Sequence, residues 1–360
     1  MDDQQPLPGS SDRLGLAIVG LNFGAHVLEK EWQDGPAKPY FDLRCVCDLR
    51  SALSDEVAQR YGVSACYDLE EVLEDPTVDV VGLFTRPQGR PGMIRRIIRA
   101  GKHVMTTKPF ALDSEAASDV LEEARQLGRH VYLNSPGPAL PDDLQTVRSW
   151  GATHNLGRPL AARWATWVNY REVPDGSWYD DPALCPSPPL LRLGIYGMNE
   201  LAQLFLPHET AEAVQIMQSR LFTQRPTTDH ASLNVQFSEG GLGSVFASFC
   251  VDDGLKYPDH LTLHFERGTV FRRDVLDVDV PQAQQRVELV MEKAGKPTVV
   301  QAAEFAKPLG AFYPWKALHA AILGDEEPPA DYAQRILEGV RILEAMKNAE
   351  LHQCQAQVRR

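Results

Sequence analysis

Leu14-Gly-Leu-Ala-Ile-Val-Gly-Leu-Asn-Phe-Gly-Ala25 is the stretch of sequence that decides the fold. Its first six residues are mostly apolar and predict a buried strand, Gly20 begins a turn, and the spacing of apolar residues over Ala25–Trp32 predicts a helix. Such a turn lets backbone N–H groups approach a diphosphate at a helix N-terminus, where the helix dipole favours negative charge. The stretch predicts a nucleotide-binding turn, and an ordinary strand–turn–helix is the alternative.

The glycine pattern of this turn departs from the usual dinucleotide-binding pattern G-x-G-x-x-G/A. The three positions are Gly20, Asn22 and Ala25, so the middle glycine is missing. Asparagine tolerates a positive φ better than most residues, and Gly24 adds flexibility nearby. We expect Gly20, Asn22, Phe23 and Gly24 to line the site for the cofactor phosphates.

A second predicted strand, Phe41–Cys47, ends in Asp48. An acidic residue roughly twenty positions beyond the glycine turn can accept hydrogen bonds from the ribose hydroxyls, which favours NAD. Arg50 is suited instead to the 2′-phosphate of NADP. NAD is slightly favoured, and both cofactors stay open. The alternative role of Asp48 is structural, at the N-terminus of a helix over Ser51–Tyr61.

Length and charge exclude several classes of protein. A chain of 360 residues can bury two cores and predicts two domains. The net charge of −13 disfavours nucleic acids and anionic membranes as partners, because both need a basic surface. No apolar stretch is long enough to cross a bilayer, and the polar start of the chain lacks a signal core, so we expect a cytoplasmic protein.

The cysteines and histidines do not predict a metal site. The six cysteines show no C-x-x-C spacing, and the ten histidines include no H-E-x-x-H motif. Cys45 and Cys47 alternate on one face of the second predicted strand, where buried free thiols are expected.

The order of elements predicts an α/β fold. From Leu14 to about Ser135, strands alternate with amphipathic helices, which predicts a Rossmann domain with a doubly wound parallel sheet. Residues 1–13 are expected to form a disordered tail, 14–135 the dinucleotide-binding domain and 136–360 a C-terminal substrate and oligomerisation domain with a large open, mostly antiparallel sheet. Its predicted strands are Leu160–Val168, Ala213–Ser219, Ala231–Phe237, Leu242–Phe249, Leu261–Phe265 and Arg286–Glu292.

Ligands of parallel sheets bind beyond the carboxyl ends of the strands, where the sequence places Thr85, Arg86, Lys108 and Asn134. Lys108 follows the predicted strand Lys102–Thr106, and its ammonium can donate hydrogen bonds to a substrate hydroxyl and to the nicotinamide ribose. A solvated surface lysine is the alternative. Thr85 and Arg86 are expected beside the nicotinamide, with Arg86 as a phosphate or carboxylate contact.

The chain resembles the Gfo/Idh/MocA family of oxidoreductases over nearly its whole length. Its nucleotide turn, the segment Ala100-Gly-Lys-His-Val-Met-Thr-Thr-Lys-Pro109, and the segment Leu190-Leu-Arg-Leu-Gly-Ile-Tyr-Gly-Met-Asn199 with Trp178 before it are similar to family motifs. The resemblance implies NAD(P)-dependent chemistry on sugars or cyclic polyols and a homodimer or homotetramer through the C-terminal sheet. Asn134 resembles a family asparagine near the nicotinamide amide.

Four positions depart from the family pattern. Thr107 replaces the usual glutamate, Arg192 stands where a catalytic aspartate is common, and Tyr196 stands where histidine is most common. Arg90 occupies the place of a frequent histidine. The resemblance therefore carries over more securely to the cofactor site than to the catalytic residues.

Arg192 and Tyr196 lie four residues apart and share one face of a predicted helix. Nearby cations such as Lys108 and Arg192 favour a tyrosinate, which would let Tyr196 take a proton from a substrate alcohol or return it in the reverse direction. The planar fork of Arg192 is suited to a substrate carboxylate or phosphate, with pairing to a local acid as the alternative. Trp178 and Asn199 complete the expected substrate site.

Three functions fit these residues. The favoured one is an NAD(P)-dependent dehydrogenase or reductase that acts on the CH–OH group of a sugar, sugar acid or cyclic polyol, with Lys108 and Tyr196 as the catalytic pair. A catalytically silent dinucleotide-binding regulator is the second. The third is a lyase or glycosidase that retains its cofactor and uses transient oxidation.

Overall fold

The computed structural model describes residues 12–352, apart from 34, 207, 256, 276–283 and 308–312. The expected N-terminal tail lies outside the described residues except for its last two positions. Contacts between residues divide the chain into two compact units. The first unit comprises residues 1–139 and 311–333, and the second comprises residues 140–310 and 334–360.

Residues 311–333 return to the first unit, whereas the sequence places them with the C-terminal domain. Aromatic contacts and a hydrogen bond account for this: the rings of Trp315 and Phe41 meet edge to face with centroids 5.5 Å apart. The hydroxyl of Tyr332 accepts a hydrogen bond of 3.1 Å from the backbone N–H of Leu133. These contacts join residues that are far apart in the sequence, so no local sequence pattern predicts them.

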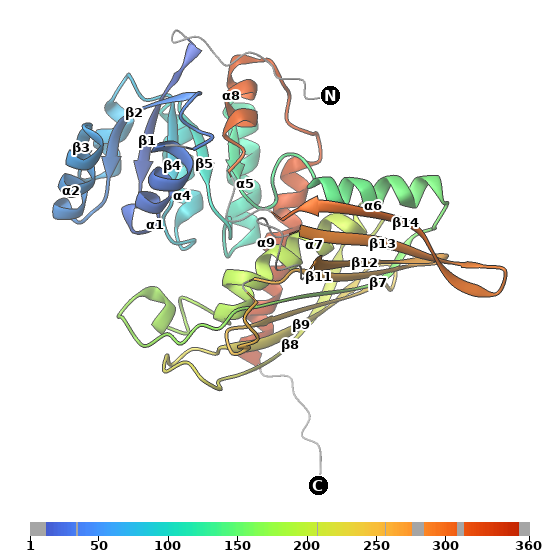
Figure 1. Cartoon of the computed structure of the whole chain (residues 1–360). Helices are drawn as coiled ribbons and strands as arrows, with labels where there is room; N and C mark the ends of the chain where they lie inside the picture. Colours follow the sequence, from blue (N-terminus) through green and yellow to red (C-terminus); the bar gives the residue numbers. More distant parts are fainter. Residues whose placement is uncertain are drawn as a thin grey trace. The chain divides into compact units, whose positions relative to one another are not determined.

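The first unit contains a six-stranded sheet in the order β3-β2-β1-β4-β5-β6 (Figure 1). All neighbouring strands in it are parallel, so the predicted doubly wound Rossmann sheet is confirmed. Leu16 and Ile18 of the central strand are almost fully buried. The strands are β1 (Leu14–Val19), β2 (Phe41–Cys47), β3 (Ser64–Cys66), β4 (Val80–Leu83), β5 (His103–Thr106) and β6 (Val131–Leu133).

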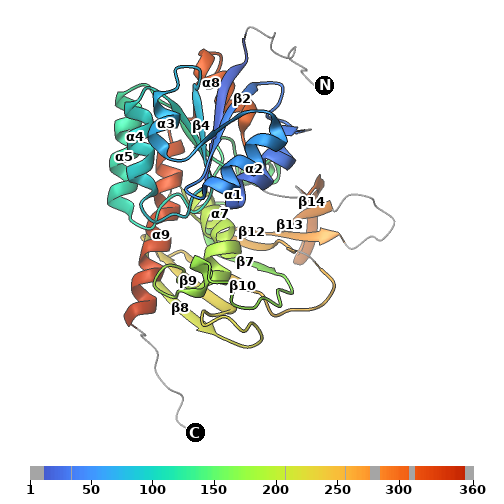
Figure 2. The same cartoon turned by 90° about the vertical axis from the view of Figure 1, so that its left-hand side faces the viewer.

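Helices cover both faces of this sheet. Figure 2 shows α1 and α2 on one side of it and α4 and α5 on the other. The helices are α1 (Leu21–Val27), α2 (Ser51–Tyr61), α3 (Leu69–Glu74), α4 (Arg90–Arg99), α5 (Ser114–Gln126) and α8 (Trp315–Leu323).

The first helix begins at Leu21, four residues earlier than the prediction of a helix from Ala25. Gly20 takes the left-handed conformation with φ of +89°, and its carbonyl accepts the N–H of Gly24 at 2.9 Å. The chain therefore turns into the helix within one residue of the strand. The helix continues as a π-helical segment over Leu28–Gln33.

The second unit contains an eight-stranded sheet in the order β14-β13-β12-β11-β7-β10-β9-β8. Only β7 and β10 pair in parallel, so the predicted mostly antiparallel sheet is confirmed. The strands are β7 (Pro159–Trp167), β8 (Ala211–Ser219), β9 (His230–Phe237), β10 (Leu242–Ser248), β11 (His260–Phe265), β12 (Gly268–Val275), β13 (Gln284–Lys293) and β14 (Lys296–Ala306). The sequence missed β12 and β14. The edge strand β14 is exposed along most of its length and lacks an apolar alternation.

The helices of this unit are α6 (Asp142–Thr153), α7 (Ile195–Phe205) and most of α9 (Tyr332–His352), with a 3₁₀ turn at Trp178–Asp180 and a π-helical segment at Leu190–Gly194. Helix α7 lies tightly on the sheet at Gly197. A Cβ atom at this position would come within 2.3 Å of the ring of Trp164, which is itself buried. This close contact fixes the rotation of α7, and with it the direction of Tyr196 and Asn199. Across the described part of the chain, no helix is both long and apolar enough to span a bilayer.

Candidate active site

The glycine turn at the end of β1 requires a residue without a side chain. The N–H of Gly20 bonds the carbonyl of Cys47 at 2.9 Å, and a Cβ atom at Gly20 would lie 2.9 Å from the carbonyl oxygen of Phe84. Helix α1 starts immediately after it, and Asn22 and Phe23 of its first turn are exposed. This arrangement fits a diphosphate, since backbone N–H groups at a helix start attract anions.

Gly24 has a different role from the one expected. It lies inside α1 and is buried, so it supplies no flexibility to the turn. A Cβ atom at Gly24 would come within 2.7 Å of Cγ2 of Ile18 in β1. The residue therefore allows close packing of helix against strand, which is the role of the third glycine in the dinucleotide-binding pattern.

Asp48 lies directly beyond β2 and holds the turn and the following loop together. Its carboxylate accepts hydrogen bonds from the N–H of Leu21 at 2.9 Å, from the N–H of Arg50 at 3.0 Å, and from Nε and Nη2 of Arg50 at 2.9 and 3.2 Å. Burial alone would raise the pKa of Asp48, but these hydrogen bonds outweigh burial and lower it. The carboxylate is thus ionised, and its contact with a ribose stays a prediction. Leu49, which follows Asp48 in the chain, is 88% exposed.

Two further loops of the same edge are joined through Asn134. Its Oδ1 accepts the backbone N–H of Lys108 at 3.0 Å and lies 3.4 Å from the hydroxyl of Thr107. The hydroxyl of Tyr313 donates to Oγ1 of Thr107 at 3.0 Å, so the side chain that replaces the family glutamate is bonded to neutral groups. The peptide bond from Lys108 to the following proline is cis. The structure thus brings together Lys108 and Asn134, both expected at the cofactor site.

The loop after β4 carries the other two predicted residues of the first unit. Thr85 is half-buried, and its hydroxyl lies 3.8 Å from the sulfur of Met93. Arg86 is exposed. Their contact with a cofactor stays a prediction.

In the second unit, Arg192 lies among three aromatic rings and one carboxylate. Its Nη1 bonds both oxygens of Glu172, at 2.9 and 2.8 Å. Its guanidinium lies 4.7 Å from the ring of Tyr170, 4.6 Å from Tyr179 and 5.0 Å from Phe249. Burial raises the pKa of both tyrosines, so their rings face the cation as neutral phenols. The alternative of a local acidic partner is therefore realised, and a substrate contact of Arg192 stays a prediction.

Glu172 also belongs to a wider ion-pair network. Arg225 donates through Nε to Glu172 at 3.0 Å and also bonds Asp175 and Asp180, at 3.0 and 2.5 Å. Sequence reasoning missed Glu172 and Arg225 because neither has a local signal. They lie 53 residues apart in the chain and meet only through the fold.

The other expected substrate residues differ in burial. Tyr196 and Trp178 are half-buried, and the Trp178 ring lies against that of Tyr179, with centroids 4.2 Å apart and the ring planes tilted by 31°. Asn199 is only 3% exposed, and its side-chain oxygen would collide with a Cβ atom at Gly339 of α9. Of these residues, Tyr196 and Trp178 are the more available to a substrate.

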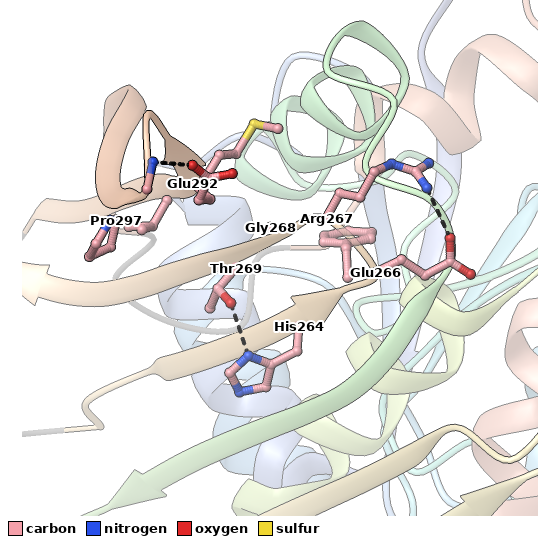
Figure 3. Close-up of a pocket in the computed structure, with 11 residues that line it drawn as sticks. His264, Glu266, Arg267, Gly268, Thr269, Glu292 and Pro297 are labelled. Atoms are coloured by element: carbon pink, nitrogen blue, oxygen red, sulfur yellow. Dashed lines mark hydrogen bonds and ion pairs between the residues drawn. The ribbon is translucent and has the colours of Figure 1, made fainter.

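A separate open groove of about 670 Å³ lies in the second unit, at the ends of the β11–β12 and β13–β14 hairpins (Figure 3). His264 Nδ1 and Thr269 Oγ1 are 3.0 Å apart at its wall. In the described part of the chain its lining includes none of the expected site residues; it consists of His264, Phe265, Glu266, Arg267, Gly268, Thr269, Val290, Met291, Glu292, Gly295 and Pro297.

Comparison with family models agrees with this architecture. Residues 14–135 match the model of an oxidoreductase family with an NAD-binding Rossmann fold, and residues 144–271 match the GFO/IDH/MocA C-terminal domain. The chain therefore belongs to the Gfo/Idh/MocA family of NAD(P)-dependent oxidoreductases, as the resemblance implied.

Individual relatives cover different shares of the chain. The 1,5-anhydro-D-fructose reductase of Ensifer adhaerens is 25% identical over 273 residues, which make up 73% of this chain and 74% of that protein. Biliverdin reductase A of Mus musculus is 30% identical over 121 residues, 33% of this chain, and the match spans only 39% of that relative's length. The solved structure of GenD2 from gentamicin A biosynthesis in complex with NAD has the same fold, with a TM-score of 0.72, 20% identity and 99% of each chain covered.

Proposed function

We propose that the protein transfers a hydride between NAD or NADP and a carbinol carbon of a sugar, sugar acid or cyclic polyol. The proposal rests on one observation. The turn of Gly20, the carboxylate of Asp48 and the Lys108–Asn134 pair all lie at the same edge of one sheet. Each belongs to the carboxyl end of a strand of one parallel sheet, where nucleotides bind. The match to a sugar-derivative reductase supports the substrate class.

The cofactor would be held by residues of the first unit. Gly20, Asn22, Phe23 and the start of α1 suit its diphosphate, and Asp48 suits the adenosine ribose. Hydride transfer at the nicotinamide ring is the chemistry that the cofactor supplies when bound. NAD stays slightly favoured, because the acidic residue at the end of β2 accepts hydroxyl donors.

Lys108 and Tyr196 are the proposed proton-handling residues. The ammonium of Lys108 donates to the substrate oxygen, and the hydroxyl of Tyr196 takes the proton from the alcohol or returns it to a ketone. Arg192, held by Glu172, and Trp178 are proposed to contact the substrate, with Asn199 in support.

Assembly and location belong to the same proposal. Exposed apolar side chains on the strands of the second sheet, among them Met217, Leu242 and Val299, support pairing of two or more copies through this sheet. We propose a homodimer or homotetramer in the cytoplasm, with no membrane or nucleic-acid partner.

The test is turnover of a panel of sugars, sugar acids and cyclitols, followed as a change in absorbance of the reduced nicotinamide. Lys108→Ala and Tyr196→Phe should each lower kcat by roughly 10²–10⁴-fold, the usual contribution of a positioned proton donor or acceptor. Lys38→Ala and Tyr67→Phe, at exposed positions of the first unit, are controls that should keep full activity. Cofactor binding without turnover of any panel member, or normal turnover by both variants, would contradict the proposal.

A further inference from the structure

Arg90 is the first residue of α4 and is only 1% exposed, although arginine is almost never fully buried without partners. It stands where the family pattern has a frequent histidine. Its position at the start of α4 places the guanidinium between the loops that follow β4 and β5.

The hydrogen bonds of Arg90 reach both loops. Its Nη1 donates to the carbonyl of Thr107 at 2.6 Å, to the carbonyl of Pro109 and, at 3.4 Å, to that of Phe110. Its Nη2 donates to the carbonyl of Thr85. One planar side chain thus joins the backbone on both sides of Lys108 to the end of β4.

This junction lies in the half of the sheet opposite to Asp48. In the order β3-β2-β1-β4-β5-β6, a dinucleotide spans both halves, and the acidic residue after β2 marks the adenosine half. The loops after β4 and β5 therefore face the nicotinamide half. A guanidinium can hold them because its donors form a rigid fork, whereas a lysine offers one compact point charge.

We propose that Arg90 is a positioning residue that sets the two loops for the nicotinamide half of the dinucleotide. The inference rests on the proposed binding of NAD or NADP. It goes beyond that proposal because it assigns the affinity for the nicotinamide half of the cofactor to Arg90 and the affinity for the adenosine half to other residues. Without Arg90, the carbonyls of Thr107 and Thr85 lose a shared donor, and the loop that carries Lys108 is held less firmly, although its bond to Asn134 remains.

The test compares NADH with ADP, which lacks both the nicotinamide and its ribose, by titration calorimetry of the full chain. Arg90→Gln should weaken NADH binding by about tenfold or more and leave ADP binding within twofold. Arg90→Lys keeps the buried charge but not the fork, so it should lose part of the NADH affinity and none of the ADP affinity. Arg96→Gln removes an exposed ion pair with Glu70 from the same helix and should change neither ligand.

The thermal unfolding midpoint of each variant is measured alongside. If Arg90→Gln does not fold, the two affinities of Arg90→Lys test the proposal instead. Equal losses of NADH and ADP affinity, or no loss of either, would overturn the proposal. Failure of the wider functional proposal looks different: the wild-type chain would then bind neither ligand, or would bind both with the expected split between variants but turn over no substrate.

Discussion

The two units hold their polar site residues in different ways. In the first unit, Asp48, Arg90 and Asn134 each bond backbone N–H or carbonyl groups of nearby loops, and Asp48 also pairs with a charged side chain, that of the exposed Arg50. In the second unit, Arg192 bonds the side chain of Glu172, which in turn is shared with another arginine. Backbone groups are present whatever the side chains nearby, so the fold alone supplies the partners in the first unit. In the second unit, each ion pair depends on the identity of two side chains.

A second ion cluster anchors the helix that carries Tyr196. Arg272 of β12 is 3% exposed and bonds Asp143 of α6 at 2.5 Å, Glu200 of α7 at 2.6 Å and also Asp259. Three carboxyl groups thus surround one buried guanidinium. Such a cluster is stable only while every charge keeps its partner, because burial of an unpaired charge is costly.

Arg272→Met should have the largest effect on stability. It leaves three carboxyl groups without their cation, which should lower the free energy of unfolding by roughly 3–5 kcal/mol. The measurement is urea unfolding followed by circular dichroism. Arg273→Met is the matched control, because Arg273 is the exposed neighbour in the same strand and its ion pair with Glu288 should be worth less than about 1 kcal/mol. If both variants lose the same free energy of unfolding, the buried ion cluster of Arg272 is worth no more than the exposed ion pair of Arg273.

Glu200→Gln should change the pH dependence of stability. Burial raises the pKa of Glu200 from its ordinary 4.5 to about 8, with Arg272 opposing the shift and Asp259 and Asp143 adding to it. The folded state therefore binds a proton that the unfolded state releases. Its contribution to stability is complete below about pH 4.5 and is lost as the pH rises through about 8, with a slope of at most about 1.4 kcal/mol per pH unit.

Urea unfolding at pH 6 and pH 9 tests this prediction. The wild-type chain should lose stability between the two values, and Glu200→Gln should lose less. Glu288→Gln in β13 is the control. Hydrogen bonds from Arg273 and Arg286 lower the pKa of Glu288, so this variant should lose as much stability between pH 6 and pH 9 as the wild-type chain does. If Glu200→Gln and the wild-type chain lose the same amount, Glu200 does not hold the proton.

The contrast between the units also explains which features were predictable. The strands Leu14–Val19 and Phe41–Cys47 have the predicted bounds, because a short apolar run between polar turns is a local signal. The helix after Gly20 starts earlier than predicted, because the conformation of a single glycine decides where it begins. Apolar spacing alone carries no information on that point.

The side-chain clusters were beyond prediction for a related reason. Arg272 and Asp143 are 129 residues apart, and no spacing in the sequence relates an arginine to three acids on separate elements. For Arg192, pattern reasoning recognised the departure from the family but not Glu172 as its partner. Partners at long range become visible only once the sheet order is known.

Arg50→Ala should have the smallest effect and bears on the choice between NAD and NADP. The carboxylate of Asp48 has about four acceptor positions, and three of its four hydrogen bonds come from Arg50, two of them from the side chain. Removal of that side chain, which is 58% exposed, costs at most about 1 kcal/mol in lost ion pairing and frees two acceptor positions for ribose hydroxyls. NAD should then bind as tightly as before or up to a few-fold more tightly, and NADP more weakly, as measured by titration of both cofactors. Arg60→Ala, which removes an exposed i,i+4 pair with Glu56 from the adjacent helix, should leave the ratio of the two affinities unchanged. A variant of Arg50 that gains affinity for NADP would show that this arginine serves Asp48 alone and takes no part in holding a 2′-phosphate.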